Sequence, residues 1–377
     1  LMVCDKEKCT GCSACFNVCP KQAITMQSDE LGNIYPVIDK SKCINCGLCK
    51  KICPQLNDIP SIKPQKTYAL YSKDVKKRMA STSGAAATIF GENIIANGGI
   101  VYGVSNLYFN NEFKFIRIDN AKDLDKIKGS KYVHAHVGTA FKDVKKDLIA
   151  GKTVMFVGTP CQIAGLKGFL MKDYGNLITV DIICHGVPSQ QLFFEQLKQY
   201  GISCSEIYEV SFRNNERYCL TIYDKNKEKI FSKPSSLIPY FRNFLQGNIF
   251  RENCYSCKYA KSERISDITI GDFWGLDNNC KIKDDINKGI SLVLVNSPKG
   301  LKLFENIKSK CVFEERTLEE AVNGNKQLQH PMSKNRKYDI FVTNYKKLGF
   351  KKTMKKMLSL KDKLKILIKK ILMKGKQ

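Results

Sequence analysis

The sequence lacks any apolar run that approaches the roughly 18 residues of a membrane-spanning helix. Its first residues also lack the charged and then apolar pattern of a signal peptide. Neither common dinucleotide fingerprint is present, since there is no G-x-G-x-x-G after a strand and no Walker A loop. These absences predict a cytoplasmic chain, and they require any bound nucleotide to be held by a less familiar loop.

Acidic residues and arginine are both scarce. The chain has 36 Asp and Glu against 62 Lys and Arg, which gives a net charge of +26, and only nine of the basic residues are arginine. Membrane surfaces and acidic partners fit this charge. No nucleic-acid partner is expected, because no recognisable nucleic-acid motif accompanies the lysines.

Cysteine, by contrast, is abundant, with 17 among 377 residues. In a long chain without an export signal, cysteines act as metal or redox ligands more often than as disulfides. Two runs within the first 56 residues have the spacing C-x2-C-x2-C-x3-C, each followed by proline. Two-cluster bacterial ferredoxins have this pattern, and the fourth cysteine of each run binds the other cluster.

The expected ligands follow from that rule. Cluster one is assigned Cys9, Cys12, Cys15 and Cys53. Cluster two is assigned Cys43, Cys46, Cys49 and Cys19. Zinc sites and a disulfide framework are the weaker alternatives, because both runs are complete and both end in proline.

Beyond the cysteine runs, the pattern predicts alternating strands and helices. Residues 57–66 carry two prolines and predict a linker. Strands are expected at 69–72, 100–104, 153–157, 177–183, 210–212 and 219–223, and helices over 83–96, 161–171 and 189–200. We therefore expect an α+β and α/β multidomain protein. Its parts are a ferredoxin domain over 1–56, α/β domains over 67–150 and 151–330, and a basic tail over 345–377.

Four further cysteines suggest another metal site. Cys161 and Cys184 each follow the end of a predicted strand. The carboxyl ends of parallel strands meet at one edge of a sheet, so these two thiols should lie close together. Cys254 and Cys257 form a C-x2-C pair. The four are expected to hold a third 4Fe-4S cluster, with a zinc site or buried free thiols as alternatives. The remaining cysteines are expected in the core: Cys4, Cys204, Cys219, Cys280 and Cys311.

In this order after a ferredoxin module, GTPCQIAGL, CHGVPS, NCYSCKYA and SDITIGDFWG resemble the coenzyme F-420 hydrogenase/dehydrogenase beta-subunit family. STSGAAATI and KGSKYV are similar to its N-terminal domain, and the resemblance covers about residues 1–300. It implies FAD beside the clusters, with 67–150 as the flavin-binding part and 151–330 carrying the third cluster and the flavin or substrate site. Archaeal members use a deazaflavin coenzyme, and a plant relative reduces a chlorophyll intermediate.

A flavin also fits the chemistry, because clusters carry single electrons, hydride carriers exchange two, and a flavin converts between them. One candidate loop precedes a predicted helix, where hydroxyls and free amides suit a pyrophosphate or, alternatively, an ordinary N-cap. It consists of Ser81, Thr82, Ser83 and Gly84. The other offers cations, a hydroxyl and a ring, and would otherwise be a surface turn. It consists of Lys128, Ser130, Lys131 and Tyr132.

Two residues are candidates for catalysis. His185 follows Cys184 and could donate a proton near the flavin, with an ordinary loop histidine as the alternative. Asp272 ends a short predicted strand and could orient the flavin ring or close the cluster loop, with a strand-end turn acid as the alternative.

The C-terminal tail is strongly basic. Residues 345–377 contain 13 lysines and one acid, and their apolar residues fall near helical spacing. A basic amphipathic helix of this kind lies on anionic membrane surfaces or docks a partner; a helix packed on the domain is the alternative. Peripheral contact with the inner face of the membrane is therefore an expectation for this tail.

Together these features predict an iron–sulfur flavoprotein oxidoreductase. It would pass electrons between 4Fe-4S clusters and FAD and reduce or oxidise an organic hydride acceptor such as a deazaflavin-type coenzyme, with ferredoxin or another redox protein as partner. Two alternatives stay open. One is an electron-transfer subunit that feeds a partner enzyme, and the other is a membrane-associated reductase in polysaccharide biosynthesis.

Overall fold

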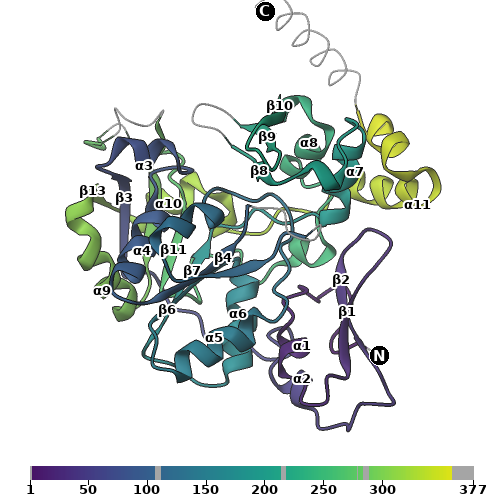
Figure 1. The fold of residues 1–377 in the computed structure, drawn as a ribbon, viewed down its shortest axis with the longest axis horizontal. Coiled ribbons are helices and arrows are strands. Elements are labelled where there is room, and N and C mark those ends of the chain that lie inside the picture. The colour runs from purple at the N-terminus through teal and green to yellow at the C-terminus, as the bar shows by residue number, and fades with distance from the viewer. Residues whose placement is uncertain (1, 107–111, 214–217, 278, 283–287, 359–377) are drawn as a thin grey trace, which may run out of the picture.

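The computed structural model describes residues 2–106, 112–213, 218–277, 279–282 and 288–358 (Figure 1). Its N-terminal domain contains two short helices, α1 (Ala14–Val18) and α2 (Leu48–Lys51), and an antiparallel hairpin of β1 (Ile24–Ser28) and β2 (Ile34–Ile38). Gly11 and Gly47 precede the helices with φ of 66° and 72°. Glycine adopts this left-handed conformation without strain, so each cysteine loop can curl back on itself before its helix starts.

An eight-stranded mixed sheet forms the body of the molecule, in the order β13-β3-β12-β11-β7-β6-β4-β5. Four neighbouring strands, β11, β7, β6 and β4, run parallel, and the other pairs are antiparallel. The strands are β3 (Lys66–Ser72), β4 (Ile100–Val104), β5 (Phe115–Ile118), β6 (Val154–Gly158), β7 (Leu177–Ile182), β11 (Ile268–Asp272), β12 (Ser291–Val295) and β13 (Cys311–Arg316).

The strands and helices predicted from the sequence are present, but the expected domain boundary at residue 150 runs through one sheet. β4 of the first range pairs in parallel with β6 of the second, and β3 pairs with β12. Ranges 67–150 and 151–330 therefore share a single folded unit. The parallel pairing of β6 with β7 agrees with the strand–helix alternation of the sequence.

Helices cover both faces of the sheet. Phe156 on β6 packs with α5 (Ala140–Ile149) and α6 (Pro160–Leu170), while its neighbour Met155 packs with α4 (Ala86–Ala96) on the other face. This alternation follows from the period of two along a strand. Further helices are α3 (Val75–Met79), α9 (Pro298–Ile307) and α10 (Leu318–Gly324).

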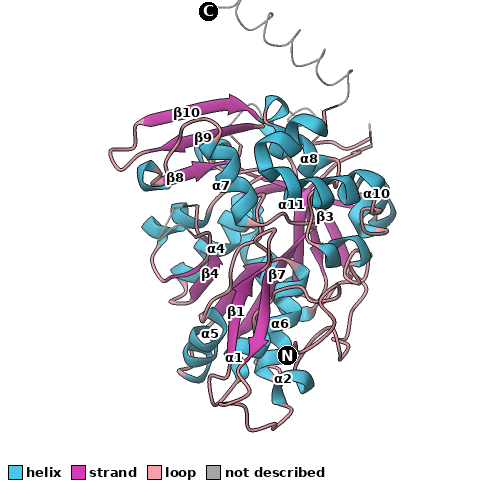
Figure 2. Ribbon diagram, turned by 90° about the vertical axis from the view of Figure 1, so that its right-hand side faces the viewer, coloured by secondary structure: helices cyan, strands magenta, loops and turns pink. Residues whose placement is uncertain are grey.

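A smaller three-stranded sheet lies above the main one (Figure 2). It contains β8 (Glu209–Ser211), β9 (Cys219–Tyr223) and β10 (Lys229–Pro234). Helices α7 (Gln190–Lys198) and α8 (Pro239–Leu245) pack beside it. The segment expected as a linker is held in place, because the backbones of Ile62 and Arg264 exchange hydrogen bonds of 2.7 and 2.8 Å.

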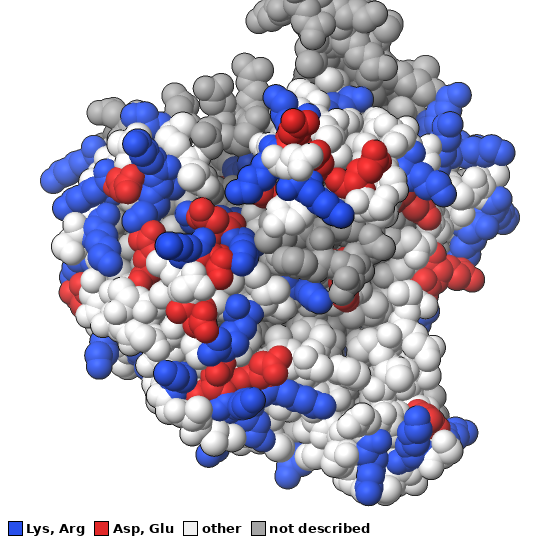
Figure 3. All heavy atoms as spheres, in the orientation of Figure 1, with Lys and Arg blue, Asp and Glu red and all other residues white. Residues whose placement is uncertain are grey.

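The described part of the basic tail packs on the protein itself. Helix α11 (Arg336–Lys356) kinks at Gly349. The apolar residues Phe350, Met354 and Met357 are buried in the same core as α7 and α8. Lysines gather on the outer side of this helix (Figure 3). For residues up to 358 the structure thus favours the packed-helix alternative, and the rest of the predicted amphipathic helix, 359–377, lies outside the described residues.

Candidate functional site

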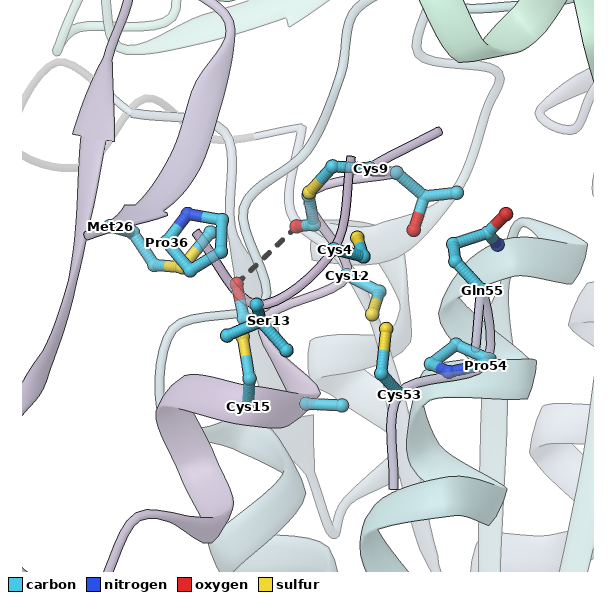
Figure 4. A pocket seen from close by; sticks show the side chains of 14 residues that line it. Cys4, Cys9, Cys12, Ser13, Cys15, Met26, Pro36, Cys53, Pro54 and Gln55 are labelled. Carbon is cyan, nitrogen blue, oxygen red and sulfur yellow. Dashed lines mark hydrogen bonds between the residues drawn. The ribbon is translucent and has the colours of Figure 1, made fainter. Parts of the chain in front are cut away.

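The cysteines assigned to cluster one surround one small cavity. Figure 4 shows Cys9, Cys12, Cys15 and Cys53 around this space, with Cys12 and Cys53 pointing toward one another. All four are buried. Cys53 comes from the second cysteine run, and it reaches the cavity because α1 and α2 pack side by side. The structure therefore brings together the crossed set of ligands that the spacing predicts.

A second cavity in the same domain is lined by Cys19 together with Cys43, Cys46 and Cys49. These are the residues assigned to cluster two. Unlike the first set, this set lies near the surface, with Cys46 exposed and the other three partly exposed. The two cavities thus form an inner site and an outer site.

Cys4 was expected in the core, but it lines the inner cavity as a fifth cysteine. A hydrogen bond with the Cys4 thiol, and less strongly the nearby Arg251 guanidinium, lower the pKa of Cys9 to about 6 against the opposing effect of burial. The sequence contained no signal for Cys4, because it stands five residues before the first run and outside its spacing.

The second cysteine set comes from three loops that meet beside the ferredoxin domain. Burial, with the nearby thiols of Cys184 and Cys257, raises the pKa of Cys161 to about 12. Burial also raises the pKa of Cys254, with further contributions from the other three thiols of the set. Mutual effects of this kind require short separations, so the structure brings these four predicted ligands together. Among the described residues, no three His, Cys, Asp or Glu side chains converge on a point that would hold a single metal ion.

Local structure explains the position of Cys161. Thr159 caps α6, and the Gln162 side-chain oxygen accepts hydrogen bonds from the Thr159 amide and hydroxyl, each at 3.0 Å. The cap fixes Cys161 in the first turn of α6, directly after β6. Cys184 follows β7, the neighbouring parallel strand, so both thiols lie at the same edge of the sheet.

Helix α6 also forms the contact between the two parts of the molecule. A Cβ added at Gly165 would lie 2.9 Å from the Cys12 sulfur, and one at Gly168 would lie 2.4 Å from the Ile52 carbonyl oxygen. Cys161 and Gly165 are four residues apart on α6, so the second set and the inner set contact the same face of this helix, one turn apart.

A much larger cavity, of about 460 Å³, opens at the carboxyl ends of the parallel strands. Ligands of α/β proteins bind at this edge of the sheet. Nearly all of the predicted flavin and catalytic residues line the cavity: Ser81, Thr82, Ser83, Lys128, Ser130, Lys131, Tyr132, His185 and Asp272. Cys184 lines it too, so the cavity adjoins the second cysteine set.

The serine-rich loop approaches the cavity just before α4. Gly84 does not line the cavity; a Cβ there would lie 2.1 Å from the Leu70 carbonyl oxygen, so only glycine fits against β3. Ala85 caps α4 without a side-chain hydrogen bond, and Ser83 donates its hydroxyl to the Ile290 carbonyl at 2.8 Å. The amides at the start of α4 thus have no side-chain cap and face a small-residue wall of the cavity.

The second predicted loop contains Lys128, Ser130, Lys131 and Tyr132. Its Lys131 side chain bonds to the backbone of the same loop. The Lys131 ammonium lies 2.7 to 3.1 Å from the carbonyl oxygens of Ile127, Lys128 and Gly129 and donates to all three. In this structure the Lys131 ammonium holds the backbone of its own turn at the cavity wall, and its role in binding a flavin stays a prediction. Tyr132 contributes its ring, which packs on Phe244 with centroids 5.2 Å apart.

His185 has a protein partner at each ring nitrogen. Nε2 donates to the Leu245 carbonyl at 3.3 Å, and Nδ1 accepts from the Gln327 amide at 2.9 Å. Burial lowers the pKa of His185, and the ring packs edge-on against Phe244 and Phe250. The residue is a neutral histidine with a fixed ring, closer to the loop-histidine alternative than to a free acid.

Asp272 is paired with a residue that the sequence did not suggest. Its carboxylate accepts from Arg213 at 3.0 Å, and Arg213 lies over the Tyr218 ring at 4.3 Å and donates to its hydroxyl. Arg213 and Tyr218 line the large cavity as well. No spacing rule links residues so far apart, and only the fold brings Arg213 to the end of β11.

Comparison with protein families identifies both parts of the chain. Residues 8–57 match the 4Fe-4S dicluster domain. Residues 151–321 match the C terminus of the coenzyme F420 hydrogenase/dehydrogenase beta subunit. Residues 151–321 therefore form a region of this beta-subunit family.

The beta-subunit region, together with the dicluster domain, supports an iron–sulfur electron-transfer oxidoreductase. The matched region begins just before β6 and contains all four cysteines of the second set. No protein with a curated description matches the chain. Among solved structures, a chain of the F420-reducing [NiFe] hydrogenase complex from Methanosarcina barkeri aligns with 16% identity and a TM-score of 0.47, covering 70% of this chain and 91% of its own.

None of the described helices is both long and apolar enough to cross a membrane.

Proposed function

We propose that this beta-subunit relative is an iron–sulfur flavoprotein that passes electrons between an outer cluster, an inner cluster, a third cluster and FAD, and so reduces or oxidises an organic hydride acceptor. One observation carries the proposal. Three cysteine sets lead from an exposed site, through a buried one, to a cavity of 460 Å³ that the last set adjoins through Cys184.

The second cysteine set suits a 4Fe-4S cluster. Its residues are Cys161, Cys184, Cys254 and Cys257. All four cysteines are partly exposed, yet burial raises the pKa of each thiol, so they stay protonated unless a cation takes the place of the protons. Iron supplies that charge, and thiolates are its preferred ligands in clusters.

The large cavity suits FAD. Its volume lies within the range of about 300–1,000 Å³ that is typical of small-molecule sites. The start of α4 would hold the pyrophosphate, because its amides lack a side-chain cap and the helix dipole favours an anion there. When bound, FAD would convert single electrons into a hydride.

The residues around that cavity would hold and orient the ring system. Tyr132 and Phe244 offer aromatic faces, and Arg213 holds the Asp272 carboxylate in one orientation at the end of β11. His185 would keep its proton on Nε2, bonded to the Leu245 carbonyl, so we assign it a positioning role.

The outer cluster is the proposed point of exchange with a redox protein. Cys46 is exposed, and so are five lysines nearby in the sequence: Lys21, Lys40, Lys42, Lys50 and Lys51. Ile44 beside them is 57% exposed. An apolar side chain ringed by lysines suits an acidic partner such as a ferredoxin.

The test is the iron and flavin content of each chain after anaerobic purification. We expect about 12 irons, three clusters of four, and one FAD. Cys254→Ser with Cys257→Ser should lower the iron to about eight and leave the ferredoxin clusters intact. The matched control is Cys311→Ser, a buried thiol that bonds only to backbone carbonyls of its own turn. A wild-type chain with about eight irons and no flavin would contradict the proposal.

A further inference from the structure

Arg251 is one of the most deeply buried charged residues in the described chain. Its side chain is 1% exposed. It precedes Cys254 by three residues, yet its Nε donates to the Cys9 carbonyl at 2.8 Å, and its guanidinium lies over the Tyr35 ring at 4.1 Å. Arg251 therefore extends from the loop of the second cysteine set into the ferredoxin domain.

Among the described residues, no Asp or Glu carboxylate pairs with the charge of Arg251. Neither Nη1 nor Nη2 has a hydrogen-bond partner, and no ion pair of the described residues includes this guanidinium. A buried charge without a partner costs several kcal/mol. A nearby anion stabilises a buried arginine of this kind. The thiols nearest to Arg251 are the expected ligands of clusters.

The contacts of Arg251 reach both cysteine sets. Its Nε donates to the Cys9 carbonyl of the inner set at 2.8 Å, and its own carbonyl accepts from the Cys254 amide of the second set at 3.0 Å. Gly11, in the inner cysteine loop, also packs against the Arg251 guanidinium. A Cβ there would lie 2.9 Å from His134 Cε1, 3.1 Å from the Ile34 carbonyl oxygen and 3.3 Å from Arg251 Cζ, so the loop needs glycine where these groups converge.

Tyr259 is a second residue that lies at the contact between the ferredoxin domain and the second cysteine set. Its hydroxyl is buried and has no hydrogen-bond partner among the described residues. Tyr259 packs in one buried cluster with Cys12 of the inner set, and Cys161 and Cys257 of the second set pack against that cluster. Tyr259 and Arg251 thus lie between the inner set and the second set, each with polar atoms that lack protein partners.

We propose that Arg251 is the shared counter-charge of the inner cluster and the third cluster. A cluster held by four thiolates is negatively charged and becomes more so on reduction, so a buried cation nearby favours the reduced form. Arg251 is therefore a positioning residue that raises the reduction potentials of both clusters and eases the electron step between them. Its effect on the third cluster rests on the proposed function, whereas its effect on the inner cluster needs only the dicluster domain.

The experiment is a redox titration of the full-length protein, followed by electron paramagnetic resonance of the reduced clusters. Arg251→Gln removes the charge, and Arg251→Lys keeps it. We expect Arg251→Gln to lower the ratio of reduced to oxidised inner cluster about tenfold at a fixed potential, a shift of about 59 mV for one electron. Arg251→Lys should restore most of that ratio.

Arg78→Gln is the matched control. Arg78 is also buried, lies over the Tyr71 ring at 3.8 Å and donates to the Gly289 carbonyl, but it packs beside β3 and away from the cysteine sets. The reduction potentials of the clusters in Arg78→Gln should equal those of the wild type.

Iron content, measured in parallel, separates the outcomes. Unchanged potentials in an Arg251→Gln protein with full iron would overturn the proposal. If Arg251→Gln loses iron, retention of iron and potential by Arg251→Lys supports the counter-charge, and loss of iron in both variants overturns it in favour of a role for the guanidinium shape. A wild type with about eight irons would reject the third cluster but still allow the test at the inner one.

Discussion

At the scale of single side chains, buried ion pairs between residues that are far apart in the sequence hold the site together. Asp181 on β7 and Arg264 form an ion pair with 3.0 Å between oxygen and nitrogen, and both side chains are almost fully buried. Arg264 also donates to the carbonyls of Tyr259 and Lys261, which follow the second cysteine set. The pair thus ties the cysteine loop to the sheet.

Asp181→Ala should strongly destabilise the protein, because it leaves the Arg264 guanidinium buried without its anion. Removing one partner of a buried pair costs about 3–5 kcal/mol. The loss is checked by thermal unfolding. Glu92→Gln is the control, since it breaks a 2.6 Å pair with Lys77 that is partly exposed and should cost about 1 kcal/mol or less. Equal melting temperatures for the two variants would contradict this view of Arg264.

The sequence revealed the cysteine ligands but not the charges around them. Cysteine runs have a spacing because one loop must surround one cluster, and that spacing is visible in the chain. Arg251 is only one residue in RENCYSC until the fold brings it against Cys9. Arg213 and Asp272 are likewise joined only by the packing of β8 and β11 regions. His185 and Lys131 were correctly placed beside the cavity, but their hydrogen bonds depend on residues that no local pattern indicates.

At the scale of elements, the glycine face of α6 determines how closely the ferredoxin domain approaches the sheet. Gly165 and Gly168 lie three residues apart, on one side of the helix, against Cys12 and Ile52. Cys161 of the motif GTPCQIAGL lies on this same side of α6, one turn before Gly165, so one helix face carries a cysteine of the second set and the close contact with the inner set.

Gly168→Ala should loosen the contact between α6 and the ferredoxin domain. Alanine would favour the helix by about 1 kcal/mol, but its Cβ would approach the Ile52 carbonyl oxygen to 2.4 Å, and such overpacking costs about 1–3 kcal/mol. Hydrogen exchange within residues 8–57 should become faster. Gly175→Ala, whose Cβ would enter open space, is the control and should leave the exchange unchanged; faster exchange in both would argue against the contact.

Secondary structure was largely predictable, and the division into domains was not. Buried strands such as Val154–Gly158 are short apolar runs bounded by glycine, which local patterns detect. Strand order depends instead on pairing between distant segments, such as β3 with β12 and β13. A sequence pattern carries no register for such pairs, so one sheet appeared as two domains.

At the scale of the whole molecule, the outer and the inner cysteine sets differ in their exposure to solvent. The outer set is exposed and lies among lysines, whereas the inner set is buried against α6. In the view of Figure 3, most of the charged side chains at the foot of the ferredoxin lobe are basic. Electron exchange with an acidic protein should therefore depend on charge.

Lys50→Glu with Lys51→Glu should slow reduction of the clusters by a reduced bacterial ferredoxin at low salt by about tenfold, because steering by charge raises association rates by about 10-fold or more. Stopped-flow absorbance measures the rate. The charge-matched control is Lys302→Glu, in α9, with Lys310→Glu, in the turn that follows α9, on the opposite side of the molecule. If cluster reduction were slowed equally in both double variants, or if its rate did not depend on salt, electrons would enter the protein at another site.

The segment between the ferredoxin domain and β3 has a consequence for kinetics. Ile62 is bonded to Arg264, Asp58 lies 2.8 Å from the Lys258 ammonium, and on the other side Lys346 of α11 lies 2.8 Å from Glu30. A carrier domain on a free tether must diffuse before each electron step, and its rate falls in a viscous solvent. Here the domain that would hold the inner cluster is bonded to the rest of the protein on two sides. Internal electron transfer should therefore proceed at the same rate in water and in concentrated sucrose.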